Sequence, residues 1–214
     1  MARGEARVAT SRTVWPALGL AVLLATCGAA AAEPAARSGN YESLTLAVSG
    51  SAVAGVFAEQ RGTADPGGPQ FSCIFLMRGT LAGDGATVET WYPGEPERIA
   101  GRLDFTRGGA ALTLSENHGG CLMTTGSMVG TPYALSRNAG EVSTEWVGVG
   151  LVTAKRTAFR HEPGPVPARA PYLVQYDPVA VLERRDDWLR VRYRGEKAPV
   201  IGWLPAVDLA VVMP

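Results

Sequence analysis

The sequence is poor in histidine, lysine and cysteine, and its charges cancel. Its 214 residues include two histidines, two lysines and three cysteines, and 20 basic side chains balance 20 acidic ones. A chain without net positive charge lacks the electrostatic footprint that attracts nucleic acid or an anionic bilayer. We therefore expect no nucleic-acid partner.

Recognisable cofactor and nucleophile motifs are also missing. The serine-hydrolase turn GxSxG does not occur, and the glycine-containing stretch "GVGLVTAK" lacks the spacing of a phosphate loop. Gly148 and Gly150 alternate there with apolar residues, which indicates a strand with a bulge or close packing. The sequence thus predicts no cofactor.

The acidic residues leave one enzymatic alternative open. Glu89, Glu95, Glu97 and Asp104 include enough carboxylates for the acid and base of a glycosidase, whose separation in space identifies the mechanism. Scattered acids on turns and strand edges are more often a solvated surface. The solvated surface is our default interpretation.

The first 32 residues have the three-part layout of a secretory signal peptide. Three arginines precede a 12-residue apolar run from Val14 to Ala25, and small residues end at Ala32. A membrane-spanning helix needs about 20 apolar residues, so we expect no transmembrane segment in the mature chain. We predict export to the periplasm or the medium, with residues 1–32 removed.

The mature chain is expected to begin at Glu33 and to open with a short leader, residues 33–40. It would carry 17 basic and 19 acidic side chains, a net charge of −2. An alternative follows from "LATC", because Cys27 stands where bacterial lipoproteins carry their acylated cysteine. In that case the protein is anchored to a membrane surface by lipid.

Cleavage after residue 32 leaves two cysteines, Cys73 and Cys121. An even pair in an exported chain predicts one structural disulfide. Two alternatives use His118, three residues before Cys121: a cysteine nucleophile activated by the histidine, or a metal site. Structural zinc sites usually have four protein ligands and catalytic ones three, so the disulfide is favoured and no metal site is expected.

Between residues 41 and 160, apolar side chains recur with a period of two. In "FSCIFLM", for example, Phe71, Cys73 and Phe75 fall on one side of a strand. The predicted strands lie in "YESLTLAVSG", "AVAGVFAEQ", "FSCIFLM", "ATVETWY", "RIAGRLDF", "AALTLSE", "CLMTT" and "EWVGVGLVTAK". This pattern predicts an all-β domain, an antiparallel sandwich or small barrel, whose interior holds either a ligand or its own side chains.

A proline-rich linker, residues 161–170, separates this domain from a tail of further short strands, residues 171–214. The tail contains "VLE", "DW", "VRY", "GW" and "DL" in this order, and these motifs resemble bacterial SH3 (SH3b) domains. The usual first strand, similar to "LNVRSGPS", is missing, so either the domain begins at "PYLV" or a segment such as "AFRHEP" replaces that strand. The resemblance implies a small barrel that binds peptides, cell-wall fragments or a neighbouring domain.

Alternation within the tail separates its core from its surface. In "DDWLRVRY", Leu189 falls on the face opposite Trp188, and we assign Leu189 to the core. The SH3 resemblance implies that Leu204 is also core, whereas Pro205 lies on the groove side. Trp188 matches the groove tryptophan of peptide-binding SH3 domains, and Trp203 completes the expected ligand-binding set.

These observations predict an exported, non-catalytic binding protein of a bacterial cell envelope. Its expected partner is a protein, a peptide or a peptidoglycan fragment. The alternative is a peptidoglycan-directed hydrolase with the tail as its targeting module, which a cluster of His118 and acids in an open cleft would favour. In a third interpretation, the tail packs against the larger domain as a structural lid.

Overall fold

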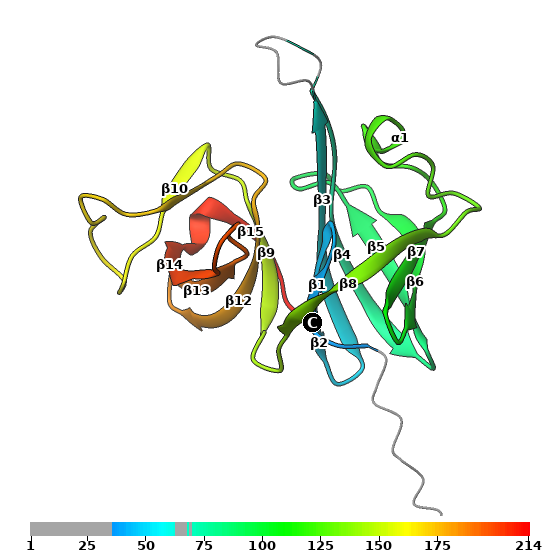
Figure 1. Cartoon of the computed structure of the whole chain (residues 1–214), viewed down its shortest axis with the longest axis horizontal. Coiled ribbons are helices and arrows are strands. Elements are labelled where there is room, and N and C mark those ends of the chain that lie inside the picture. Colours follow the sequence, from blue (N-terminus) through cyan, green and yellow to red (C-terminus); the bar gives the residue numbers. More distant parts are fainter. Residues whose placement is uncertain (1–35, 63–67, 69) are drawn as a thin grey trace, which may run out of the picture. The chain divides into compact units, whose positions relative to one another are not determined.

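The computed structural model describes residues 36–62, 68 and 70–214, and the first eight strands close into an antiparallel barrel (Figure 1). Each strand pairs with its sequence neighbours, and β1 closes the barrel against β8 through an irregular register. The barrel strands are β1 (Gly39–Tyr41), β2 (Leu44–Ser49), β3 (Ala52–Gly62), β4 (Gln70–Ala82), β5 (Gly85–Trp91), β6 (Ile99–Thr106), β7 (Gly109–Leu114) and β8 (Tyr133–Val142). The all-β prediction is confirmed, and the larger domain is a barrel.

The barrel interior is filled with the protein's own side chains. Alternate residues of the strands point inward, as the period-two pattern predicted. The buried set includes Leu44, Leu46, Val53, Phe57, Phe75, Met77, Val88, Leu103, Leu112 and Leu135. Of the two interiors that the sequence left open, the structure has the packed one.

The outer face of the first barrel strands is also apolar, because a second sheet covers it. Outward-facing Ala54, Val56, Ile74 and Leu76 form a second core with residues of the C-terminal strands, among them Leu151. A strand buried on both faces has no need for polar residues on one side. This contact explains the nearly continuous apolar runs of β3 and β4.

The C-terminal strands form a five-stranded and a two-stranded sheet, which we call together the C-terminal module. It contains β9 (Gly148–Val152), β10 (Arg156–Ala158), β11 (Tyr172–Val174), β12 (Pro178–Arg185), β13 (Trp188–Tyr193), β14 (Val200–Pro205), η1 (Ala206–Asp208) and β15 (Leu209–Val212). The order of the larger sheet is β14-β13-β12-β9-β15, and β10 pairs with β11. Its own core includes Val181, Leu189, Val191 and Leu204.

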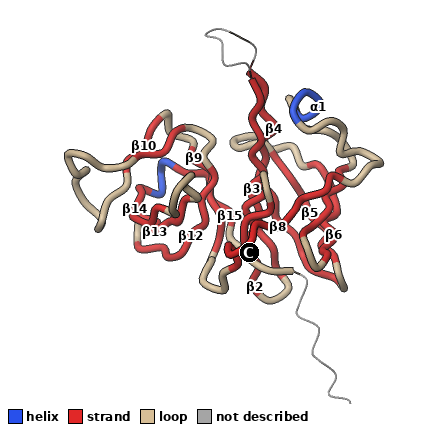
Figure 2. Tube along the Cα trace, viewed as in Figure 1, coloured by secondary structure: helices blue, strands red, loops and turns tan. Residues whose placement is uncertain are grey.

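Three strand assignments differ from the sequence-based ones. The segment "CLMTT" was expected as a strand, but Cys121–Thr124 is a short helix, α1, in a secondary structure otherwise dominated by strands (Figure 2). β8 was not predicted, because "YALSRNAGEV" lacks regular alternation. The strand in "EWVGVGLVTAK" was assigned to the larger domain, whereas β9 pairs with β12 and β15.

Because β9 pairs with strands of the C-terminal module, the barrel ends with β8. The larger domain was expected to extend to residue 160. β9 also lies between β12 and β15, in a sheet that the sequence assigned to residues 171–214 alone. Its glycines permit close packing, as expected: a Cβ at Gly148 would lie 2.8 Å from the carbonyl oxygen of Val212. One of the five strands of this sheet thus comes from upstream of the proline-rich segment.

Residues 1–35 lie outside the described part of the chain. The signal peptide, the cleavage site at Glu33 and the alternative lipid attachment at Cys27 therefore remain predictions from the sequence. Within the described residues, no helix is long and apolar enough to cross a membrane.

Candidate functional site

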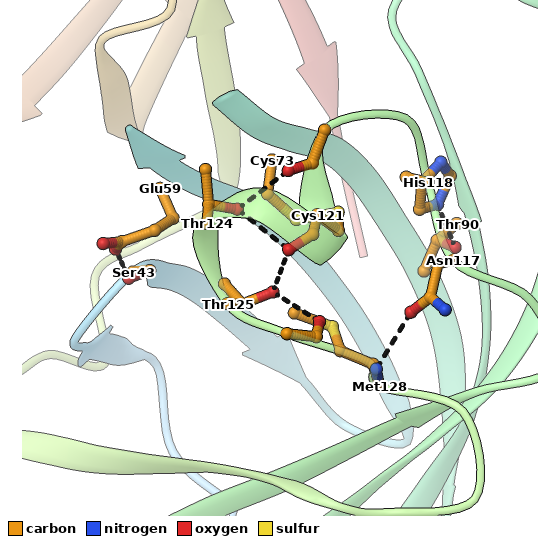
Figure 3. Close-up of a disulfide and its surroundings, with 12 residues drawn as sticks. Ser43, Glu59, Cys73, Thr90, Asn117, His118, Cys121, Thr124, Thr125 and Met128 are labelled. Carbon is orange, nitrogen blue, oxygen red and sulfur yellow. Dashed lines mark hydrogen bonds between the residues drawn. A yellow bond between two sulfur atoms is a disulfide. The ribbon is translucent and has the colours of Figure 1, made fainter. Parts of the chain in front are cut away.

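Cys73 of β4 and Cys121 of α1 form the predicted disulfide (Figure 3). Both residues are fully buried in the barrel core, and the bond joins positions 48 residues apart in the sequence. The alternative in which Cys121 acts as a free nucleophile does not fit this bonded state. No group of three or more potential metal-ligating side chains occurs among the described residues.

The disulfide anchors a loop, residues 115–130, over one part of the barrel. Asn117 holds the two limbs of this loop together: its Oδ1 accepts from the Met128 backbone N–H at 2.9 Å, as Figure 3 shows. Gly120 precedes α1 with φ +79°, and a Cβ there would lie 2.0 Å from the carbonyl oxygen of Ser72. Only glycine combines that backbone conformation with that close approach.

His118, in the same loop, continues a stack of aromatic rings out of the barrel core. Phe57 stacks on Phe75 with centroids 4.8 Å apart, and Phe75 stacks on the imidazole of His118 at 4.6 Å. Nε2 of His118 lies 2.8 Å from Oγ1 of Thr90 (Figure 3). The histidine is only 9% exposed.

Thr90 links His118 to the neighbouring strand β6. Its Oγ1 lies within hydrogen-bond distance of Nε2 of His118, at 2.8 Å, and of the carbonyl oxygen of Ile99, at 3.1 Å. Burial lowers the pKa of His118, which favours the neutral imidazole.

The lowered pKa of His118 predicts that stability falls as the pH drops. Below about pH 6.5 the histidine of the unfolded chain takes up a proton, whereas folded His118 stays neutral until its lower pKa is reached. The free energy of unfolding should thus decrease with falling pH across that window. Urea unfolding at several pH values gives the pH dependence of the free energy of unfolding for the wild type and for His118→Gln. The difference between the two slopes is the contribution of His118. His161→Gln is the control and should keep the wild-type slope; equal slopes for all three proteins would contradict the prediction.

His118 also lines an open cleft of about 590 Å³, which we call the His118 cleft. Ile99, Tyr92 and His118 supply buried and half-buried walls, and the exposed side chains of Glu95, Glu97 and Glu116 add three carboxylates. Two of the four acids considered from the sequence, Glu95 and Glu97, are thus brought together. Glu89 and Asp104 do not line this cleft.

The expected binding residues of the C-terminal module lie on one face of its β12–β13–β14 meander. Trp188 and Pro205 are direct cross-strand partners, and Trp203 is two residues before Pro205 on the same strand. Leu189 and Leu204 pair on the opposite face and are fully buried, as predicted. We call the surface formed by Trp188, Trp203 and Pro205 the Trp188 face.

Arginine side chains cover much of the Trp188 face. The guanidinium carbon of Arg185 lies 4.5 Å from the ring centroid of Trp203, which is only 3% exposed. Arg160 lies 4.9 Å from the ring centroid of Trp188, and its Nε donates to the carbonyl oxygen of Gly164. Trp188 and Pro205 stay half-buried, so they provide more accessible surface than Trp203 does.

An apolar groove of about 280 Å³ shares Arg160 with this region. Its walls include Phe159, Pro167, Val200 and the half-exposed Ile201. Further positive charge at the groove comes from Arg169. The module therefore combines an accessible tryptophan with an apolar, arginine-containing groove.

Sequence reasoning did not find the full His118 cleft. It missed Tyr92, directly after β5, and Glu116 in the turn "ENHGG", which line the cleft, and Thr90 of β5, which is hydrogen-bonded to His118. These residues look like ordinary strand and turn positions, and only the barrel brings them together. Comparison with protein-family models, with curated proteins and with solved structures gives no match.

Proposed function

We propose that the protein is an exported, non-catalytic binding protein of a bacterial cell envelope, and that its C-terminal module is an SH3-like recognition module. The ligand is a peptide, a protein segment or the peptide part of peptidoglycan. The observation that carries this proposal is the Trp188 face, where a half-buried tryptophan and a proline lie side by side across two strands.

The composition of this face suits recognition of peptides. Tryptophan and arginine are enriched among the residues that dominate binding energies at interfaces. Arg169 adds donors that suit the carboxylates of a peptide chain. The neighbouring groove is large enough for an apolar side chain. Together these features favour an anionic peptide with an apolar residue.

Truncating Trp188 is the direct test of the proposal. Trp188→Ala should weaken binding to purified peptidoglycan sacculi or to their released stem peptides by about 2 kcal/mol or more, as loss of an aromatic anchor does. Co-sedimentation with sacculi and titration calorimetry with the peptides measure the change. Thermal unfolding followed by circular dichroism should show that the variant remains folded.

Trp91 provides a matched control on the barrel. It is also half-buried, and the guanidinium of Arg98 lies 4.5 Å from its ring centroid. Trp91→Ala should leave binding to sacculi and peptides unchanged. Equal binding by Trp188→Ala and the wild type would refute the assignment of the Trp188 face, and absence of binding by the wild type would refute the peptidoglycan ligand.

The His118 cleft gives a specific reason to retain a hydrolase as the second candidate. A histidine and three glutamates line this open cleft. A hydrolase would release soluble fragments from sacculi with turnover, and Glu97→Gln or Glu95→Gln would abolish that release. A binding protein would sediment with the sacculi and leave them intact.

A further inference from the structure

β14 is an edge strand of the five-stranded sheet, and only part of its outer edge is covered. β13 occupies one side of the strand. On the other side, Trp203 exchanges two backbone hydrogen bonds with Arg160, at 3.0 and 2.8 Å. The segment that follows Arg160 forms bends and makes no further bridge to β14 within the described residues. The start of β14 is therefore an open edge.

Ile201 presents an N–H and a C=O on this open edge. Backbone groups of an antiparallel strand alternate between its two sides, so those of Ile201 point the same way as those of Trp203, two residues later. No hydrogen bond to either outward group of Ile201 occurs in the described part of the chain. The preceding outward position is Pro199, which has no N–H. The open edge is thus a template for one short added segment.

The apolar groove of about 280 Å³ lies beside the open edge, and we call it the β14 groove. Ile201, Val200 and Phe159 supply apolar walls. Arg169 and His161 add basic side chains, and no aspartate or glutamate is among the described residues that line the groove. These walls are complementary to an apolar side chain next to a carboxylate.

The covered part of the edge determines which end of a peptide fits. Arg160 already occupies the place beside Trp203, so an added chain has to end before that point. A chain parallel to β14 ends there with its C-terminal carboxylate, whereas an antiparallel chain begins there with its ammonium group. The basic side chains of the groove attract the carboxylate and repel the ammonium group.

We propose that the edge of β14 binds the C-terminal residues of a peptide as a short parallel strand. The N–H of Ile201 donates to a peptide carbonyl oxygen, and its C=O accepts from the N–H of the last peptide residue. The apolar side chain of that residue fills the β14 groove, and its carboxylate accepts from Arg169. This inference rests on the proposed peptide recognition and deepens it, because it makes the free C-terminus the recognised group.

The peptide acetyl-Ser-Thr-Val with a free C-terminal carboxylate is the probe, and the same peptide with a C-terminal amide is its control. Titration into the predicted mature chain, residues 33–214, is followed by NMR chemical shifts. We expect saturable binding of the free acid, with shifts concentrated at residues 159–161, 167–171 and 199–203. The amide should bind at least about tenfold more weakly, and so should acetyl-Ser-Asp-Val amide, whose only carboxylate is on a side chain.

Removing single backbone donors tests the strand pairing. Ile201→Pro deletes the outward N–H at an edge position that tolerates proline, and it should weaken binding of the free acid at least about tenfold. Ile201→Val keeps the N–H and should change binding less than about twofold. A probe with an N-methylated valine amide lacks the donor to Ile201 and should bind the wild type at least about tenfold more weakly. This last measurement does not depend on the folding of the proline variant.

Two arginine variants of equal charge separate the groove from general electrostatics. Arg169→Gln should weaken binding of the free acid about threefold or more, whereas Arg78→Gln, at an exposed arginine of the barrel, should leave it unchanged. Equal losses in the two variants, or equal affinities of the acid and the amide, would overturn the recognition of the carboxylate.

Other outcomes would overturn the binding site itself. No saturable binding of the free acid, shifts outside the β14 groove, or full binding of the N-methylated probe would each do so. Concentration-dependent dimerisation with shifts along β14 in the absence of peptide would assign this edge to a second copy of the chain. Binding of sacculi that depends on Trp188 would still support the proposed function in all these cases. Conversely, a tripeptide that binds at β14 while sacculi do not bind would refute only the peptidoglycan ligand.

Discussion

Replacing both Cys73 and Cys121 with alanine is expected to lower the free energy of unfolding by about 4 kcal/mol. The bond closes a loop spanning 48 residues, and cross-linking a loop of this size removes roughly that much conformational free energy from the unfolded chain. Both cysteines are fully buried, so the lost packing of their sulfur atoms adds to the cost. Chemical unfolding of the wild type and the double variant measures the difference.

Reduced wild-type protein is the control for the cysteine variant. Its unfolding in the presence of a reductant should resemble that of the alanine variant, because both chains lack the cross-link. The native, unreduced protein should give no thiol labelling at either cysteine. Rapid labelling of Cys121, or a stability loss below about 1 kcal/mol, would show that the bond does not stabilise the fold in this way.

Leu189→Ala is expected to destabilise the C-terminal module by roughly 2 to 5 kcal/mol, the range for truncating a buried leucine. Leu189 is fully buried in the module's core and pairs with Leu204 of the adjacent strand. Alanine would leave a cavity between these strands. Tryptophan fluorescence during urea unfolding follows the module, since Trp188 and Trp203 lie in the same sheet.

Ile201→Ala is the matched control, because it removes an aliphatic side chain from the same meander. Ile201 is 50% exposed, so its loss should change the free energy of unfolding by less than about 1 kcal/mol. Similar destabilisation by the two substitutions would contradict the assignment of Leu189 to the core and of Ile201 to the surface.

The strands themselves were largely readable from the sequence. Period-two alternation gives the buried side of a strand from consecutive residues, so the inward positions of β4, such as Phe75, were predicted correctly. The same local argument assigned Leu189 to the core. The disulfide followed from the cysteine count and the expected export, because assigning Cys27 to the predicted signal peptide leaves only one pairing.

Only the tertiary structure shows which sheet contains β9 and which residues form the His118 cleft. β9 has the pattern of any buried strand, and its partners β12 and β15 lie farther along the chain, beyond the proline-rich segment. The cleft depends on Thr90 holding His118, residues that are 28 positions apart. The sequence by itself determined the strand pattern, the inward-facing residues and the disulfide, because each depends on neighbouring residues or on composition. Which strands pair, and which side chains line a cleft, depends on the closure of the barrel and on packing between distant segments. The local periodicity of the sequence contains no information about either.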